Sequence, residues 1–595
     1  MTASPEGPAP AGPLTRAAAA LGRAGAGLAS PLIARAWGRA LLLALVCAAA
    51  FLPGLSALPV TDRDEGRFVQ ASRQMIESGD WIDIRFQDEP RWKKPAGIYW
   101  MQAAAVSTFG APTAERLWAF RLPSLIGAVL TVFGAAWALS PLLGASAATL
   151  AAGFTGLSVI LAAEANIAKT DGMLNGMTVI AMGAWIRRLT GAGLLGAAPA
   201  ETPPGARPPQ ALALALILWI ALAVTVLLKG PIGVMVLALA ALALALLERS
   251  RAPLAALGLA TPGPLVFLAL ALPWYVAIHL ATDGAFWDEA LFNDLLGKVA
   301  GNQPAHGAPP GTYLGVMWGT FWPWAPLMIL AAPAVWAARR SRPALLLLCW
   351  AIPTWLVFEL TPTKLPHYVL PAVPALTGLV AWWWTTQATE PRRWQTGLAA
   401  LLFALVGVAL GLAGLALPLA LGLAPSIPAA LLGLAAAALA LLGQAALRAG
   451  DRQGLLTSGA LSAACIYASV LQFGLPSLTF AFPSVPMAAA SAPFAECAGR
   501  PAASQSYREP SLVFLQGTGT RLMSVEEAAE ALRAEPGALV WLEDRRRDRT
   551  LDLLGPDAPA LETLAEVTAF NPNRGRVTTL RLTARQGDPI LAPCR

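Results

Sequence analysis

The stretch ALALALILWIALAVTVLL, from Ala211 to Leu228, decides the class of this protein because it contains no charged residue. A helix needs about 20 apolar residues to cross the hydrocarbon core of a bilayer. A second run, from Ala416 to Leu442, is also free of charge and longer. In the whole chain of 595 residues, 56% are hydrophobic and 13% are charged, whereas soluble domains carry about 25% charged residues. These patterns predict a polytopic α-helical membrane protein.

Apolar runs of this kind recur along the chain and predict about 13 transmembrane helices. They lie near residues 38–58, 119–139, 143–163, 171–189, 211–228, 230–247, 262–281, 313–337, 343–360, 367–385, 396–418, 427–447 and 455–475.

Arginines in alternate short loops indicate the orientation of these spans, because cytoplasmic loops carry an excess of Lys and Arg. With the N-terminus in the cytoplasm, the same side receives Arg187, Arg188, Arg207, Arg249, Arg251, Arg339, Arg340, Arg342, Arg392, Arg393, Arg448 and Arg452. The net charge of +7 is therefore explained by topology, and no nucleic-acid-binding motif accompanies it. An odd number of spans then places the C-terminal domain on the outer, periplasmic side.

The expected organisation has three parts. Residues 1–36 are rich in Pro, Ala and Gly and predict a disordered cytosolic leader without a cleavable signal peptide. Residues 37–475 form the transmembrane domain, with large periplasmic loops at 59–118 and 282–312. Residues 476–595 form a small periplasmic α/β domain.

The first outer loop opens with TDRDEGRFVQASRQMIESGDWI, from Thr61 to Ile82, which has the spacing of an amphipathic juxtamembrane helix. Two functions are open for its acids. Asp62 as N-cap with Glu65 three residues on would form a capping box, which leaves Asp64 as a candidate catalytic carboxylate.

Basic residues of the outer loops are candidates for binding phosphate, because Lys and Arg make charge-assisted hydrogen bonds with phosphate oxygens. Arg67, Lys94 and Lys364, from three separate stretches of outer-loop sequence, would converge on one phosphate. The alternative for Lys93 and Lys94, which follow Trp92, is that they extend toward lipid headgroups. Asp171 has two readings as well, as a helix N-cap or as a residue of the site.

Six motifs occur in an order that resembles aminoarabinose (4-amino-4-deoxy-L-arabinose) lipid A transferases, relatives of the protein O-mannosyltransferases within the GT-C superfamily. The motifs are DEGRFVQASRQMIESGDW, KKPAGIYW, AKTDGML, KGPIG, LPW and KLPHYVLP. The resemblance implies a GT-C fold and an inverting glycosyltransferase of the bacterial inner membrane. Its donor would be a sugar on polyprenyl (undecaprenyl) phosphate, and its acceptor lipid A or a related envelope glycolipid.

The resemblance also implies roles for individual residues. Asp64 and Asp171 are the expected catalytic residues; Arg67, Lys94, Tyr368 and Lys364 are expected to bind the donor phosphate; and the substrate cavity is expected to include Glu65, Lys93, Trp92, Lys229 and His367. We expect the protein to be a monomer. We also expect no obligatory cofactor, since fixed cations can replace a metal ion. The alternatives are transfer to another polysaccharide or to protein, and a non-enzymatic lipid-linked sugar flippase or transporter.

The chain departs from this family at Lys93, where aminoarabinose transferases commonly carry Glu. A carboxylate at this position can recognise a sugar amine, and a lysine reverses that charge. The sequence therefore predicts a different donor sugar, either a uronic acid or a neutral sugar.

The histidines and cysteines give two further expectations. His306, in the second outer loop, is a weak candidate metal ligand. Cys497 and Cys594 flank the C-terminal domain, and an oxidising periplasm would favour a disulfide between them.

Local patterns predict the elements of the C-terminal domain. Strands are expected at residues 511–517, 538–543 and 576–585, a helix from Ser524 with Glu527 completing a capping box, and a solvated turn at 543–550.

Overall fold

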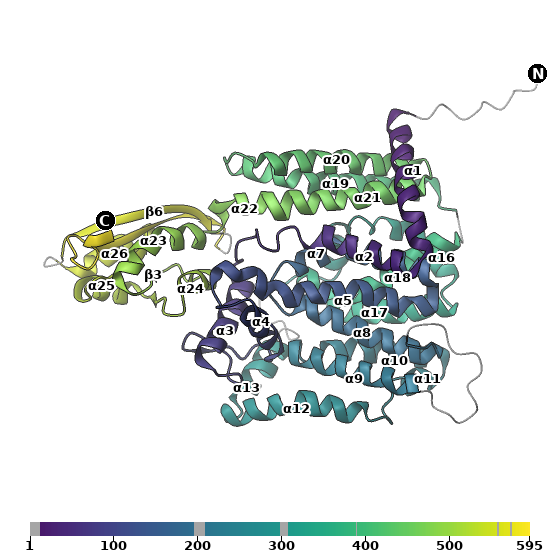
Figure 1. The fold of residues 1–595 in the computed structure, drawn as a ribbon, viewed down its shortest axis with the longest axis horizontal. Coiled ribbons are helices and arrows are strands. Elements are labelled where there is room, and N and C mark those ends of the chain that lie inside the picture. The colour runs from purple at the N-terminus through teal and green to yellow at the C-terminus, as the bar shows by residue number, and fades with distance from the viewer. Residues whose placement is uncertain are drawn as a thin grey trace, which may run out of the picture.

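The computed structural model describes residues 12–194, 209–297, 307–387, 390–555, 559–571 and 574–594. Helices dominate, and most run side by side in one bundle, with the C-terminal domain attached at one end (Figure 1). Each of the 13 predicted spans coincides with a helix or with a broken pair of helices. The bundle helices are α2 (Ala36–Phe51), α5 (Leu117–Leu143), α6 (Ala145–Gly156), α7 (Val159–Ala165), α8 (Asp171–Thr190), α9 (Pro209–Lys229), α10 (Ile232–Glu248), α12 (Gly263–Ala281), α15 (Thr312–Thr320), α16 (Leu327–Ala337), α17 (Arg342–Leu360), α18 (Val373–Thr386), α19 (Arg393–Ala420), α20 (Ile427–Arg448) and α21 (Arg452–Tyr467).

Among the described residues, eight helices are long and apolar enough to cross a membrane. The count rises to nine if α6 and α7, which meet at a bend of 65°, form one span. Helices α2, α10 and α16 are apolar but shorter. The chain is a polytopic α-helical membrane protein, as its composition predicts.

The prediction of a disordered leader is wrong for residues 13–34, which form helix α1 (Pro13–Ala34). This segment contains the run Ala17 to Ala20, and alanine is the strongest helix former. Small residues also let α1 lie closely on α21. A Cβ atom added at Gly22 would stand 2.4 Å from the backbone nitrogen of Gly454.

Short helices gather at the end of the bundle that carries the C-terminal domain (Figure 1). We call this the domain end. It holds α3 (Asp64–Ser78), α4 (Gly97–Thr108) and α13 (Ala285–Trp287), which continues into a π-helix, η2 (Asp288–Leu296). A 3₁₀-helix, η4 (Pro366–Ala372), leads into α18. The short helix α11 (Ala252–Ala255) lies at the opposite end, beside the arginine-bearing loop that follows α10.

The C-terminal domain is a five-stranded mixed sheet with helices, in the strand order β4-β3-β5-β7-β6. Strand β3 is parallel to β4 and β5, whereas β7 is antiparallel to β5 and β6. The elements are α23 (Ser484–Ala498), β3 (Ala503–Gln505), α24 (Pro510–Gln516), β4 (Leu522–Met523), α25 (Val525–Ala534), β5 (Val540–Glu543), α26 (Asp544–Leu554), β6 (Leu561–Asn571) and β7 (Arg576–Arg585).

Two predicted elements of this domain are wrong. Residues 511–516 of the predicted strand are helical in α24, and residues 544–554 form α26, not a turn. A short apolar run bounded by turn residues does not distinguish a strand from a buried helix, and Pro510 suits the first turn of a helix.

The other local predictions for the domain are confirmed. Strands β5 and β7 form, and Ser524 and Glu527 make both hydrogen bonds of the capping box of α25. Cys497 and Cys594 form a disulfide, with their Cα atoms 6.3 Å apart.

Candidate active site

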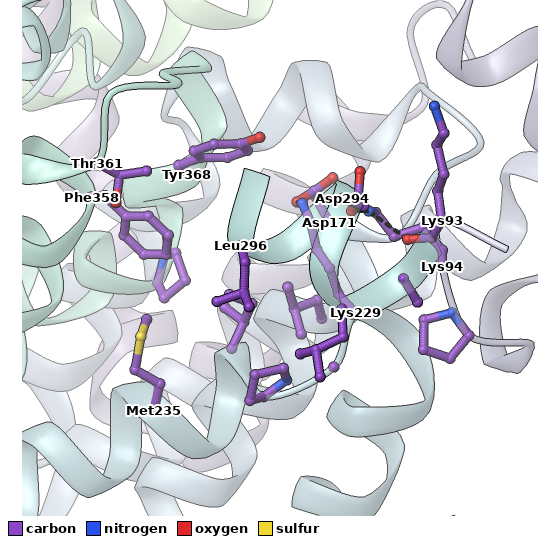
Figure 2. Close-up of a pocket in the computed structure, with 18 of the residues that line it drawn as sticks. Lys93, Lys94, Asp171, Lys229, Met235, Asp294, Leu296, Phe358, Thr361 and Tyr368 are labelled. Carbon is purple, nitrogen blue, oxygen red and sulfur yellow. Dashed lines mark hydrogen bonds and ion pairs between the residues drawn. The ribbon is translucent and has the colours of Figure 1, made fainter. Parts of the chain in front are cut away.

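A cavity of about 390 Å³ opens at the domain end between α8, α9, η2 and η4 (Figure 2). Its charged and polar residues include Lys93, Lys94, Asp171, Lys229, Asp294, His367 and Tyr368. Its remaining wall is mostly apolar and includes Leu174, Ile232, Met235, Phe286, Trp287, Leu296, Val357, Phe358 and Leu370. We call it the lysine cavity. It combines a charged region with an extended hydrocarbon surface.

Lys94 lies on this cavity in an ion pair with an acid that the sequence had not indicated. Its Nζ atom is 2.6 Å from Oδ2 of Asp294, on η2. The neighbouring Lys93 is more exposed and lies 3.7 Å from Glu289 of the same helix. The second large loop thus supplies an acid to each lysine of the first.

Lys229, at the end of α9, reaches Asp171 at the start of α8. Its Nζ atom donates to Oδ1 of Asp171 over 2.5 Å and lies 5.2 Å from the ring centroid of Tyr368. Nε2 of His367 is 3.6 Å from the other carboxylate oxygen of Asp171. Asp171 therefore orients two cavity residues. The helix N-cap position falls on Thr170, which makes no side-chain capping bond.

Glu164 and Lys169 complete this cluster, and neither is among the residues predicted for the site. Nζ of Lys169 lies 2.9 Å from Oε1 of Glu164, and Nδ1 of His367 lies 3.5 Å from the same oxygen. All three side chains are buried. Glu164 and Lys169 lie within seven positions of Asp171. Charged residues are rare in this apolar chain, so their position beside Asp171 could have indicated that they belong to the site.

Asp64 and Arg67 lie on a second cavity, of about 440 Å³, between the N-terminus of α3 and the C-terminal domain. We call it the aspartate cavity. It is lined by Asp62, Arg63, Asp64, Arg67, Leu365, Arg508, Glu509 and Arg574. The predicted catalytic acid therefore does not share the lysine cavity. One segment borders both, because Leu365 lines the aspartate cavity and Tyr368 lines the lysine cavity.

The environment of the aspartate cavity shifts two pKa values. Burial raises the pKa of Asp62 to about 7; the Ser511 hydroxyl, which donates a hydrogen bond to this carboxyl, acts in the opposite direction. The pKa of Arg67 is lowered, chiefly by burial and secondly by the positive charge of Arg91.

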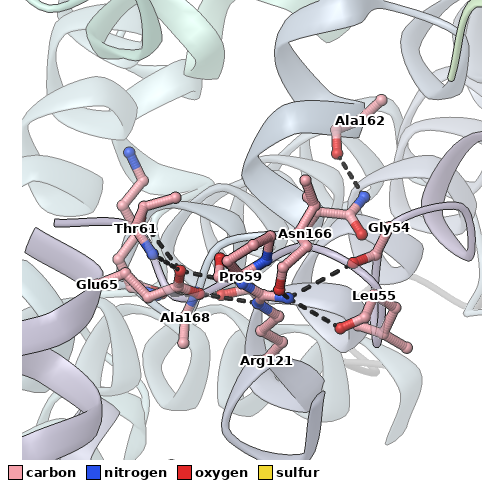
Figure 3. A network of polar contacts seen from close by, with 12 residues as sticks. Gly54, Leu55, Pro59, Thr61, Glu65, Arg121, Ala162, Asn166 and Ala168 are labelled. Carbon is pink, nitrogen blue, oxygen red and sulfur yellow. Dashed lines mark hydrogen bonds and ion pairs between the residues drawn. The ribbon is translucent and has the colours of Figure 1, made fainter. Parts of the chain in front are cut away.

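Glu65 is not a cavity residue, which corrects the prediction. Its side chain is fully buried and accepts two hydrogen bonds from Arg121, from Nε over 2.8 Å and from Nη2 over 3.0 Å (Figure 3). Backbone N–H groups of Thr61 and Ala168 also donate to it. Burial raises the pKa of Glu65, but Arg121 and these hydrogen bonds outweigh it, so the pKa lies below its ordinary value.

Arg121 extends this contact to the backbone of the segment before α3. It donates hydrogen bonds to the carbonyl oxygens of Leu55, Leu58 and Pro59. Glu65 therefore fixes α3 to α5. The alternative of a capping box with Asp62 as N-cap is excluded, since α3 begins at Asp64 and its N-cap residue is Arg63.

Three other predicted residues lie away from the lysine cavity or outside the described part of the chain. Nζ of Lys364 donates to the carbonyl oxygens of Thr361 and Ala308. The indole of Trp92 donates to Asp83 over 2.7 Å. His306 lies outside the described residues. Within the described ranges, no group of three or more His, Cys, Asp or Glu side chains is arranged to hold a metal ion.

No family model matches the chain. A curated protein of Pseudomonas aeruginosa (strain PAO1), undecaprenyl phosphate-alpha-4-amino-4-deoxy-L-arabinose arabinosyl transferase, is 28% identical over 323 residues, covering 53% of this chain and 54% of the relative. A transferase of Pseudomonas fluorescens (strain Pf0-1) that carries the same description is 26% identical over 365 residues, covering 58% and 60% of the two chains. The chain thus spans about half the length of the curated relatives it matches.

The fold agrees over a longer part of the chain. The crystal structure of ArnT from Cupriavidus metallidurans bound to undecaprenyl phosphate superposes with a TM-score of 0.68 and 22% identity, covering 92% of this chain and 98% of that one. Its apo state gives a TM-score of 0.67. The resemblance expected from the motifs is confirmed, and the chain has the GT-C fold of these proteins.

Proposed function

We propose that this chain is an inverting glycosyltransferase that moves a sugar from a polyprenyl phosphate donor to an envelope glycolipid. The lysine cavity carries the proposal. It presents lysines at a charged region and continues along an apolar wall, which matches a phosphate headgroup followed by a hydrocarbon chain. The curated relatives are named for an undecaprenyl phosphate-linked donor.

Lys94 and Lys229 would stabilise the departing phosphate. Negative charge grows on the phosphate oxygen as the bond to the sugar breaks, and fixed cations near that oxygen lower the barrier. Asp294 and Asp171 hold these two lysines in place within 2.6 Å and 2.5 Å. The cations are therefore oriented before the donor arrives, and Tyr368 lies beside Lys229 to complete the site.

Asp64 would act from the acceptor side. Inversion requires that the acceptor approach the sugar opposite the leaving phosphate, and Asp64 lies on a different cavity from the lysines. A carboxylate there can accept the proton of an attacking hydroxyl. With an ionised phosphate as the acceptor no proton need be removed, and Asp64 positions the acceptor instead.

The charge of Lys93 indicates which class of donor sugar the site would accept. Its ammonium group is exposed at the edge of the lysine cavity, 3.7 Å from Glu289. A base at this position suits a uronic acid or a neutral sugar better than an amino sugar. We propose that the donor sugar differs from aminoarabinose.

The site would face the periplasm, with the N-terminus in the cytoplasm. The arginine-rich loops at 249–251 and 339–342 support this, because such loops mark the cytoplasmic side. The loop at 249–251 adjoins α11, at the end opposite the C-terminal domain (Figure 1).

Mass spectrometry of lipid A from cells with and without the gene tests the function. Loss of one sugar from lipid A supports the proposal, and its mass identifies the donor sugar. The Asp64→Asn and Lys94→Gln variants should each fail to restore that sugar when produced at native levels. Unchanged lipid A would refute this acceptor and redirect the search to another polysaccharide or to protein.

The purified protein separates an enzyme from a flippase or binding scaffold. The Asp64→Asn variant should still bind undecaprenyl phosphate but lose at least about 100-fold in turnover, as expected when a group that accepts the proton or positions the acceptor is removed. Normal turnover in this variant would remove Asp64 from the mechanism.

A further inference from the structure

The arginines around Asp64 continue across the C-terminal domain. A hollow of about 460 Å³ on that domain is lined by Glu543, Arg545, Arg546, Arg574 and Arg576. Arg574 also lines the aspartate cavity, so the two hollows meet at one side chain. We call the joined surface the arginine track.

The arginine track carries more positive than negative charge. Its two hollows contain seven arginines and four carboxylates. Glu543, one of the four, is buried and already bound, since Nη2 of Arg576 lies 2.6 Å from it and Nη1 of Arg574 lies 3.5 Å from it. Burial of Asp62, which raises its pKa to about 7, further reduces the negative charge near neutral pH.

Three arginines of the track have no acidic partner among the ion pairs of the described residues. Arg508 precedes α24, and Arg545 and Arg546 lie in the first turn of α26; all three are exposed. By contrast, Arg549, further along α26, lies 3.9 Å from Glu526 and lines neither hollow. These three guanidinium groups thus line the two hollows that share Arg574.

The C-terminal domain is held against α3 where the track begins. A Cβ atom at Gly66 would stand 2.7 Å from the backbone nitrogen of Ser511, so α3 and α24 touch through their backbones. The Ser511 hydroxyl donates a hydrogen bond to Asp62. These contacts fix Arg508 and Glu509 beside Asp64 as one surface.

We propose that the arginine track binds the acceptor glycolipid at two of its anionic groups. One group lies at the aspartate cavity, where the sugar is received, and another is bound by the C-terminal domain. Guanidinium groups suit this task because they bind phosphate with two parallel hydrogen bonds. The inference rests on the proposed function and adds the surface that selects the acceptor.

The test compares two substitutions on one helix that remove the same charge. Arg546→Gln lies in the track, and Arg549→Gln is the matched control. Binding of bisphosphorylated and monophosphorylated lipid A to the full-length protein is measured in neutral detergent. We expect Arg546→Gln to weaken binding of the bisphosphorylated lipid by roughly tenfold, the effect of losing one hydrogen bond to a charged group, and to reduce the preference over the monophosphorylated lipid. Arg549→Gln should match the native protein.

Equal binding by the two variants, or no saturable binding of bisphosphorylated lipid A to the native protein, would overturn the inference. Phosphatidylglycerol in the same detergent is the third probe. An equal loss of phosphatidylglycerol binding in Arg546→Gln would assign the track to the membrane surface instead.

Undecaprenyl phosphate binding is measured on the same samples. If both variants still bind undecaprenyl phosphate, the donor site is intact. A change in lipid A binding then tests the arginine track separately from the proposed function. Absence of undecaprenyl phosphate binding in the native protein would instead remove the proposed function.

Discussion

Arg121 and Glu65 form a fully buried ion pair that fixes α3 to the bundle. We expect Arg121→Met to destabilise the protein strongly, because it leaves the Glu65 carboxylate buried without its cation. Removing one partner of a buried pair costs about 3–5 kcal/mol. The measurement is the thermal unfolding midpoint in detergent.

The double variant Glu65→Gln, Arg121→Met is the control for this pair. It removes both charges, so it should recover part of the lost stability. An unchanged midpoint in Arg121→Met alone would show that the pair does not hold α3.

The raised pKa of Asp62 predicts that the free energy of unfolding depends on pH. Its pKa in the folded protein is about 7, above the ordinary value of 3.8, so the folded state binds this proton more tightly than the unfolded state. Its stabilising contribution is complete below about pH 4 and is lost as the pH rises through about 7. The difference in unfolding midpoint between the native protein and Asp62→Asn should therefore change between those pH values. A constant difference would contradict the assignment.

Lysines supply the positive charge that the proposed reaction needs, so removing divalent metal should not affect it. We expect turnover after treatment with EDTA to equal that of the untreated protein, while Lys229→Gln reduces it at least about tenfold by weakening charge stabilisation. A loss of turnover that added Mg²⁺, Mn²⁺ or Zn²⁺ restores would contradict this account.

At the scale of the elements, α1 gives a prediction of packing. Gly22→Ala should lower the unfolding midpoint, because its Cβ would stand 2.4 Å from the backbone nitrogen of Gly454 in α21. Overpacking of this kind costs about 1–3 kcal/mol. Gly27→Ala, in the same helix with nothing within 4 Å of its Cβ, should leave the midpoint equal or slightly raised, because alanine favours helix. Equal behaviour of the two variants would show that α1 does not pack on α21.

The elements that the sequence predicts are those whose signal is local. Apolar runs locate the bundle helices, and the spacing of Ser524 and Glu527 locates the start of α25. Residues 511–517 were assigned wrongly because a short apolar run suits either a strand or a buried helix, and contact with α23 and α3 accompanies the helical form.

The site was predicted in part, because pairing between distant segments leaves no local pattern. The sequence placed Lys94, Asp171, Lys229, His367 and Tyr368 in one site, and the structure brings them to one cavity. It did not indicate that Asp294, 200 positions from Lys94, would pair with it. It also assigned Glu65 to the cavity, because an acid bound to a buried arginine and one that faces solvent look alike in a sequence.

At the scale of the whole molecule, the bundle and the C-terminal domain divide the proposed reaction between them. The lysine cavity lies within the bundle, whereas the aspartate cavity needs residues of the C-terminal domain, Arg508 and Glu509 among them. Donor and acceptor would thus be bound by different parts of the chain and meet beside the segment from Leu365 to Tyr368.

The most direct test is an experimental structure of the full-length protein in lipid nanodiscs with undecaprenyl phosphate. We predict the phosphate within hydrogen-bond distance of Lys94 and Lys229, and the prenyl chain along the apolar wall that includes Met235 and Phe358. A phosphate bound instead between Asp64 and Arg508, with the lysine cavity free of lipid, would contradict the central claim.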